Sequence, residues 1–245
     1  MGMEKRPTLE RSARRMRGMD RAVHSGTAKE YRSMQRRNVP RAAGAAGLAG
    51  RQGGGVGCVG VDEVGRGAWA GPLLVVASRQ SKKLPEGLRD SKLMSQKQRE
   101  EMLERLSNCC KFGEGWVEAD EIDQKGLAEA LRTGFARALS ALGVLTEEEI
   151  IIDGKINYAP QAYVRVNTVI DADQSVPLVS AASIYAKVAR DEFMLRLAKK
   201  YPVYGFDRHV GYGTNRHRQA LQEFGTLQGI HRFSYKPVKA LSLGV

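Results

Sequence analysis

Two short apolar runs that enclose a pair of acids and a glycine-rich turn constrain this chain more than any other feature. The runs are residues 56–61 and 73–77, and each has the length and composition of a buried strand. Asp62 and Glu63 follow the first run directly. Because neighbouring side chains of a strand point to opposite faces, both acids can reach one ligand only where the backbone turns or at a sheet edge.

Gly65, Arg66 and Gly67 supply such a turn. Glycine has no Cβ, so it adopts backbone conformations that other residues avoid and lets a polyanion approach backbone N–H groups. The sequence therefore predicts a site at this strand end, where acids and turn lie together.

Two further predicted strands also end in acids. The apolar residues 150–152 precede Asp153, and the β-branched run 163–170 precedes Asp171 and Asp173. Each acid alone is typical of a turn, but acids gathered in one cleft repel each other unless cations compensate. Oxygen ligands without a His or Cys cluster favour Mg²⁺ or Mn²⁺, and a pair of such ions about 4 Å apart hydrolyses phosphodiesters. A metal-dependent nuclease is the leading hypothesis.

The remaining segments alternate between helical and extended patterns. A capping box at Ser95 and Gln98 predicts a helix with an apolar face of Met102, Leu103 and Leu106. A strand is predicted over residues 111–118, and helices over residues 127–142 and 178–200. A loop over residues 208–214, a short helix over residues 219–224 and a basic tail containing His231, Arg232 and Lys236 follow. Strands mixed with helices imply an α/β domain.

The positive charge is concentrated at the N-terminus. The formal net charge is +12, and residues 1–56 carry 13 Lys or Arg against 4 Asp or Glu, which is +9 and leaves +3 for the rest. Residues 1–55 are rich in Arg, Gly, Ala and Ser, so we predict a disordered basic extension there and a folded domain over residues 56–245. Three interpretations of the extension remain open. It is a solvated tail or the result of a start codon assigned too far upstream, a nonspecific nucleic-acid tether, or an organelle transit peptide.

Cysteine usage and hydropathy bear on the compartment. The three cysteines lack paired spacing, which favours a reducing environment. No apolar run approaches the roughly 20 residues that span a bilayer. We therefore expect a cytoplasmic protein without membrane contact.

Several short motifs follow one another along the chain: GVDEVGRG at 60–67, AGP at 70–72, DSK at 90–92, IDG at 152–154, SAASIYAKVARD at 180–191, YGF at 204–206, HVGYGT at 209–214 and HRFS at 231–234. Taken in this order, they resemble the ribonuclease HII family. The resemblance covers about residues 57–238. It implies a ribonuclease H-like fold, with a central mixed β-sheet of about five strands flanked by helices and a C-terminal helical segment.

The resemblance implies an endoribonuclease that hydrolyses the RNA strand of RNA–DNA hybrids and cleaves 5′ of ribonucleotides in duplex DNA, leaving 3′-hydroxyl and 5′-phosphate ends. The residues that match the family's metal-binding acids are Asp62, Glu63, Asp153 and Asp173. The residues expected to contact substrate are Gly65, Arg66, Gly67, Lys92, Lys187, Arg190 and Tyr212.

Within that substrate set, the turn at residues 65–67 is similar to the element that reaches the ribose 2′-hydroxyl, and Tyr212 is similar to the tyrosine that packs against the sugar. Lys187 and Arg190 are expected phosphate contacts, although they fit exposed helix charges nearly as well.

Two positions depart from the family pattern. Asp171-Ala172-Asp173 replaces Lys-Gly-Asp, and Asp173 is chosen as the catalytic aspartate because the family places that acid ten residues before the serine matched by Ser183. Leu93 stands where a second lysine commonly follows Lys92.

The alternatives are a ribonuclease HIII-type enzyme, which resembles Gly-Thr-Gly where this chain has Arg66, and a nonenzymatic basic nucleic-acid-binding protein, which leaves the acids unexplained. A nucleotide-binding loop at residues 65–67 lacks the required glycine spacing. We expect a monomer. A sliding-clamp contact fits the family, but residues 240–245 contain no clear clamp-binding peptide.

Overall fold

A five-stranded mixed sheet forms the centre of the domain in the computed structural model, which describes residues 57–88 and 91–242. The strands are β1 (Cys58–Val64), β2 (Leu73–Gln80), β3 (Cys110–Val117), β4 (Glu149–Asp153) and β5 (Val166–Val169), in the order β3-β2-β1-β4-β5. β1 pairs antiparallel with β2, and β2 with β3, whereas β4 runs parallel to both β1 and β5. The predicted mixed sheet is confirmed; the predicted extension over residues 1–55 lies outside the described residues.

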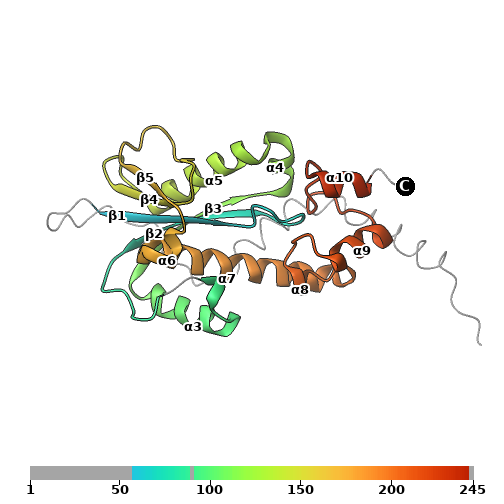
Figure 1. Cartoon of the computed structure of the whole chain (residues 1–245), viewed down its shortest axis with the longest axis horizontal. Helices are drawn as coiled ribbons and strands as arrows, with labels where there is room; N and C mark the ends of the chain where they lie inside the picture. The colour runs from blue at the N-terminus through green and yellow to red at the C-terminus, as the bar shows by residue number, and fades with distance from the viewer. Residues whose placement is uncertain (1–56, 89–90, 243–245) are drawn as a thin grey trace, which may run out of the picture. The chain divides into compact units, whose positions relative to one another are not determined.

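Helices cover both faces of this sheet (Figure 1). They are η1 (Ser91–Leu93), α3 (Gln96–Ser107), α4 (Ala119–Lys125), α5 (Leu127–Leu142), α6 (Ala172–Ser175), α7 (Pro177–Lys200), η2 (Pro202–Tyr204), α8 (Phe206–His209), α9 (Asn215–Phe224) and α10 (Lys236–Ser242). α5 packs on β2 and β3 from one side, and α7 packs on β1 and β2 from the other, with α3 outside it. The C-terminal helical segment, α8 to α10, is confirmed. Among the described residues, no helix has the length and apolar character needed to cross a membrane.

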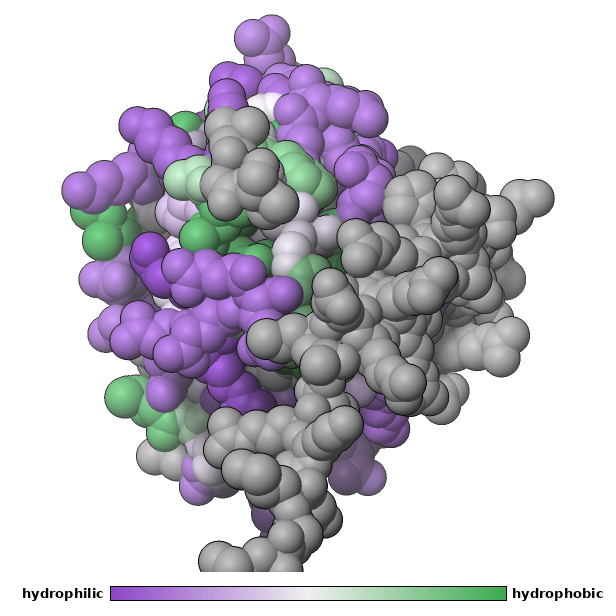
Figure 2. Space-filling view, turned by 90° about the vertical axis from the view of Figure 1, so that its right-hand side faces the viewer, coloured by the Kyte–Doolittle hydropathy of each residue, from purple (hydrophilic) through white to green (hydrophobic). Residues whose placement is uncertain are grey.

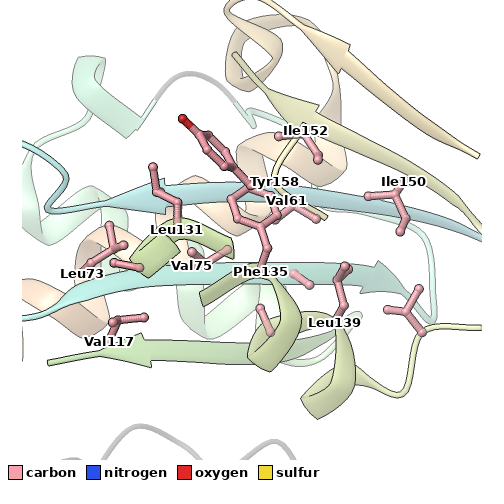
Figure 3. Close-up of a cluster of buried hydrophobic side chains, with 14 of the residues drawn as sticks. Val61, Leu73, Val75, Val117, Leu131, Phe135, Leu139, Ile150, Ile152 and Tyr158 are labelled. Carbon is pink, nitrogen blue, oxygen red and sulfur yellow. The ribbon is translucent and has the colours of Figure 1, made fainter. Parts of the chain in front are cut away.

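The helix α5 shows how the sequence periodicity builds the core. Leu131, Phe135 and Leu139 recur every fourth residue and are fully buried, which places them on one face of the helix. Figure 3 shows this face against labelled side chains of the sheet, all members of one apolar cluster. The helix ends at Gly143, whose φ of 65° is the left-handed conformation typical of a helix C-cap. The predicted helix over residues 127–142 is confirmed.

The helix α7 lies closest to the strand that carries the first acids. Its small residues, including Ala181, Ala182 and Ala186, are buried. A Cβ at Gly60 would lie 2.4 Å from the backbone of Leu178, so only glycine lets β1 and α7 approach this closely. Strand and helix therefore form one rigid support beneath Asp62.

Several elements differ from the sequence-based predictions. α4 was not predicted, because its seven residues bury only one large apolar side chain, Ile122, and so show no periodic stripe. β5 is shorter than the predicted run 163–170. The expected loop over 208–214 begins inside α8, and α9 starts four residues before residue 219. His231 and Arg232, read as part of a basic tail, have no exposed surface.

Candidate active site

Three carboxylates from separate elements meet at one edge of the sheet. Asp62 lies near the end of β1, Asp153 ends β4, and Asp173 lies on α6, which follows β5. Carboxylate oxygens of all three residues lie within 4.8 Å of one another. β1, β4 and β5 are parallel neighbours, so their carboxyl ends reach the same edge and bring together acids that are 111 residues apart in the chain (173 − 62).

Without a cation, the charged form of this buried cluster is electrostatically unfavourable. Burial raises the pKa of Asp62 to about 8, and the negative charges of Glu63 and Asp153 raise it further, whereas a hydrogen bond with Ser183 lowers it. Burial also raises the pKa of Asp153, although the Ala172 N–H donates to its Oδ1 over 2.7 Å. A divalent cation between the carboxylates would remove this repulsion.

The two carboxylate oxygens of Asp173 have different surroundings. Its Oδ2 accepts a hydrogen bond from Lys92 Nζ over 3.0 Å. Its Oδ1 is buried and accepts none from any residue in the described part of the chain. The Ser180 hydroxyl, in the first turn of α7, donates to the Asp173 backbone carbonyl and so ties Asp173 on α6 to α7. Because a buried carboxylate oxygen without a partner is costly, the cluster fits a hard divalent ion.

Glu63 lies beside the three aspartates and is not part of their cluster. Its Oε1 is 3.7 Å from Arg66 Nη1. Burial raises the pKa of Glu63, and Asp153 adds to that increase whereas Arg66 opposes it. Adjacent positions on β1 separate Glu63 from Asp62, as the alternation of a strand requires. Its role as a metal ligand stays a prediction.

The glycine-rich turn follows directly. Gly65 has φ of 86°, and a Cβ there would lie 2.2 Å from Arg190 Nε, so both its conformation and its packing require glycine. Gly67 faces open space, since a Cβ there would meet no atom within 4 Å. Arg66 between them is half exposed. The turn thus has one position fixed by the fold and one open to a ligand.

The structure corrects the expectation for Arg190. Its side chain has no exposed surface, and its guanidinium donates to the backbone carbonyls of Ala70, Pro72 and Val210 over 2.9–3.1 Å. Neither a phosphate contact nor an exposed helix charge fits this burial. Arg190 instead joins residues 70–72, which follow the turn, to Val210 in the 209–214 segment. Lys187, one turn earlier on α7, is partly exposed and pairs with Asp191 over 2.8 Å.

Tyr212 is half buried, and the Arg190 guanidinium lies 5.5 Å from its ring centroid. Its backbone carbonyl bonds to His217 Nδ1 over 3.0 Å. His217, in turn, contacts His231 through their Nε2 atoms. Both histidines are completely buried, which is a structural role. Histidine spacing in the sequence gives no sign of this network.

The two departures from the family pattern occupy different surroundings. Leu93 is 72% exposed beside Lys92, so a long charged side chain there would meet solvent. Asp171 is exposed, with φ of 54°, and caps α6 through its backbone conformation without a side-chain hydrogen bond to the helix. Its charge adds to the raised pKa of Asp153.

The end of the domain that carries α8 to α10 exposes three arginines, Arg208, Arg216 and Arg218. The same segment contacts the β1–β2 connection, because the Trp69 and Ala70 N–H groups donate to the Gly211 carbonyl. Figure 2 views this end and shows hydrophilic residues over much of the area that is not grey. These arginines were not among the substrate-binding residues expected from the sequence.

Known proteins match this chain over most of the domain that the structure describes. Residues 59–238 match the family model described as Ribonuclease HII. A ribonuclease HII of Coxiella burnetii is 40% identical over 186 residues, covering 75% of this chain and 90% of that protein. A ribonuclease HII of Streptomyces avermitilis is 42% identical over 184 residues, covering 74% of this chain and 78% of that protein.

A solved structure shows the same arrangement of elements. The ribonuclease HII of Archaeoglobus fulgidus, determined in a complex with PCNA, superposes with a TM-score of 0.63 and 30% identity, over 74% of this chain and 95% of that one. The central mixed sheet and its flanking helices are therefore a ribonuclease H-like fold, as expected.

Proposed function

This chain belongs to the ribonuclease HII family, and we propose that it cleaves 5′ of ribonucleotides embedded in duplex DNA and within the RNA strand of RNA–DNA hybrids. The proposed products carry 3′-hydroxyl and 5′-phosphate ends. The observation that carries the proposal is the cluster of Asp62, Asp153 and Asp173, in which Asp173 Oδ1 lacks a partner among the described residues. Metal-assisted hydrolysis of a phosphodiester at a ribonucleotide needs such a cation site beside a surface that recognises ribose.

The three aspartates would hold Mg²⁺ or Mn²⁺, with Glu63 completing the set from the neighbouring position on β1. Two bound ions supply an activated water and stabilise the leaving oxygen in phosphodiester hydrolysis. The chain's own residues keep the carboxylates in place: the Ala172 N–H orients Asp153, and Ser180 orients Asp173. Lys92 lies at the rim, where its ammonium can pass from Asp173 to a substrate phosphate.

Substrate selection would fall to the turn and to Tyr212. The open position at Gly67 lets backbone N–H groups approach a ribose 2′-hydroxyl, which only RNA carries. Tyr212 presents a half-buried ring for packing against the adjacent sugar. Partly exposed Lys187 is positioned for backbone phosphate once it leaves Asp191.

The decisive experiment incubates the purified full chain with an end-labelled DNA duplex that contains one ribonucleotide, with Mg²⁺, with Mn²⁺ or with chelator. We expect metal-dependent cleavage 5′ of the ribonucleotide, with end groups identified by ligation and phosphatase treatment. No cleavage with either metal would overturn the proposal, whereas cleavage in chelator would overturn its metal requirement.

A binding measurement separates metal affinity from catalysis. Calorimetric titration of Mn²⁺ should give a signal with the parent chain that is lost in Asp173→Asn. The matched control is Asp207→Asn, which changes an exposed aspartate on α8. Equal Mn²⁺ binding by all three proteins would exclude the aspartate cluster as the metal site.

Family membership decides against the ribonuclease HIII alternative, and the acid cluster argues against a nonenzymatic basic binding protein. The Archaeoglobus relative was solved with PCNA, which keeps a sliding-clamp contact open for this chain as a proposal. We also propose a monomer, which light scattering on the eluted protein would test.

A further inference from the structure

The C-terminal segment 230–235 runs along the connection between β1 and β2. The Gly71 N–H donates to the Ile230 carbonyl over 2.8 Å, and the Arg232 N–H donates to the Trp69 carbonyl over 2.8 Å. Ala70 and His231 form an antiparallel bridge between these contacts. The segment is therefore paired with the connection that begins at the glycine-rich turn.

Two side chains of this segment converge on one carbonyl of the turn. Arg66 O accepts hydrogen bonds from Arg232 Nη1 over 3.1 Å and from the Tyr235 hydroxyl over 2.5 Å. Arg232 Nη1 also donates to the Tyr235 oxygen over 2.9 Å, while Arg232 Nε and Nη2 both donate to Gly71 O. One buried guanidinium thus links both ends of the connection, and Tyr235 adds a second bond at Arg66.

The segment is itself held by the helix α4. Asp123 of α4 accepts hydrogen bonds from the Phe233 N–H over 2.8 Å and from the Ser234 N–H over 2.8 Å. The Ser234 hydroxyl donates to the same carboxylate over 2.6 Å. Three bonds to one carboxylate place the backbone immediately before Tyr235, so Asp123 acts on the turn through this segment.

We propose that Tyr235 and Asp123 are positioning residues that give the turn its selectivity for a lone ribonucleotide. This inference rests on the proposed function, in which residues 65–67 contact the ribose 2′-hydroxyl. A hybrid offers a 2′-hydroxyl at every nucleotide, so a displaced turn still finds one nearby. A lone ribonucleotide offers a single 2′-hydroxyl, so its cleavage requires the turn to lie in one position.

The test compares Tyr235→Phe with the parent chain on two substrates, a duplex with one ribonucleotide and a continuous RNA–DNA hybrid. Tyr235→Phe removes only the hydroxyl and keeps the ring that packs on the apolar cluster and lies 5.3 Å from the Arg232 guanidinium. We expect the ratio of kcat/KM on the lone ribonucleotide to that on the hybrid to fall about three- to tenfold, the range of one neutral hydrogen bond. Asp123→Ala should shift the ratio in the same direction.

The matched control is Tyr163→Phe, which removes the hydroxyl of another tyrosine that packs against the same cluster and has no hydrogen bond to the turn within the described ranges. Its ratio should equal that of the parent chain. An equal loss on both substrates in Tyr235→Phe, or an unchanged ratio, would overturn the inference and leave Tyr235 a purely structural role.

A second measurement does not depend on activity. Hydrogen–deuterium exchange of the peptide covering residues 65–72 should be faster in Tyr235→Phe than in the parent, whereas peptides of α5 exchange equally. If the parent cleaves neither substrate but exchange responds in this way, the proposed function fails while the positioning contact stands. Unchanged exchange at 65–72 refutes the positioning contact itself.

Discussion

The Nε2 atoms of His217 and His231 lie 3.2 Å apart, and the bonds on either side determine which atom holds each proton. The Leu227 N–H donates to His231 Nδ1 over 2.8 Å, so His231 carries its proton on Nε2 and donates it to His217. His217 then carries its own proton on Nδ1 and donates to the Tyr212 carbonyl. Both rings must be neutral for this chain of bonds, which ends at the tyrosine expected to contact the sugar.

The neutral histidine pair predicts loss of stability in mild acid. Burial is the largest cause that lowers the pKa of His217 to about 4 and that of His231 to about 3. An unfolded histidine titrates near pH 6.5, so below that pH the unfolded state binds protons that the folded state excludes. The free energy of unfolding should fall by roughly 1.4 kcal/mol per pH unit for each histidine, from pH 6.5 to about pH 4.

Urea denaturation of the parent chain and of His231→Asn isolates this effect. Carboxyls with raised pKa values, such as Asp62, change stability in the opposite sense, but they cancel in the difference between the two proteins. The variant should be less stable at pH 7.5, and this deficit should shrink by up to about 2 kcal/mol at pH 5. A deficit independent of pH would contradict a neutral His231.

The two glycines of the turn should respond differently to alanine. Gly65→Ala places a Cβ 2.2 Å from Arg190 Nε at a φ of 86°, so we expect a loss of roughly 2–4 kcal/mol in unfolding free energy. Gly67→Ala meets no atom within 4 Å and should fold normally. Its cleavage of a lone ribonucleotide should nevertheless fall, because the new methyl group occupies the open face of the turn. Thermal melts and rate measurements on both variants check this contrast, which fails if Gly67→Ala has parental activity.

The two acids on either side of Ala172 should contribute very differently to turnover. Asp173 is fully buried in the cluster, so Asp173→Asn should lower kcat by more than about 100-fold, beyond what changes around a metal ligand usually cost. Asp171 is exposed with φ of 54°, a conformation that asparagine tolerates, so Asp171→Asn should keep most turnover. Single-turnover assays at saturating Mg²⁺ compare them. The reverse order of activities would show that the wrong aspartate has been assigned to the metal.

Two of the basic residues of α7, Arg190 and Lys187, should differ in how their replacement affects stability. Arg190→Lys loses a guanidinium that serves three carbonyls in the interior, so stability should fall by roughly 2–4 kcal/mol. Lys187→Ala removes a partly exposed lysine and should change stability by less than about 1 kcal/mol. If Lys187 contacts phosphate, the slope of log binding constant against log salt concentration for the hybrid should be shallower by about one in the variant. An unchanged salt slope would leave Lys187 as a helix ion pair with Asp191.

Local patterns were sufficient where a residue's role depends on its near neighbours. The capping box at Ser95 and Gln98 forms as predicted, with both reciprocal bonds present. The stripe on α5 is buried as its spacing indicated. Polar residues were harder to place, because a long cation such as Arg190 reads as solvent-exposed unless its acceptors are known.

The sequence by itself determined the strands, the two long helices and the acids at the strand ends, because hydrophobic periodicity and turn chemistry act within a few residues. Only the tertiary structure decided which polar groups meet. Arg190 bonds to a carbonyl 120 residues away and Arg232 to one 161 residues away, and no local pattern encodes such partners. The tertiary structure likewise brings Asp62, Asp153 and Asp173 together, because parallel pairing of β1, β4 and β5 places distant strand ends at one edge of the sheet.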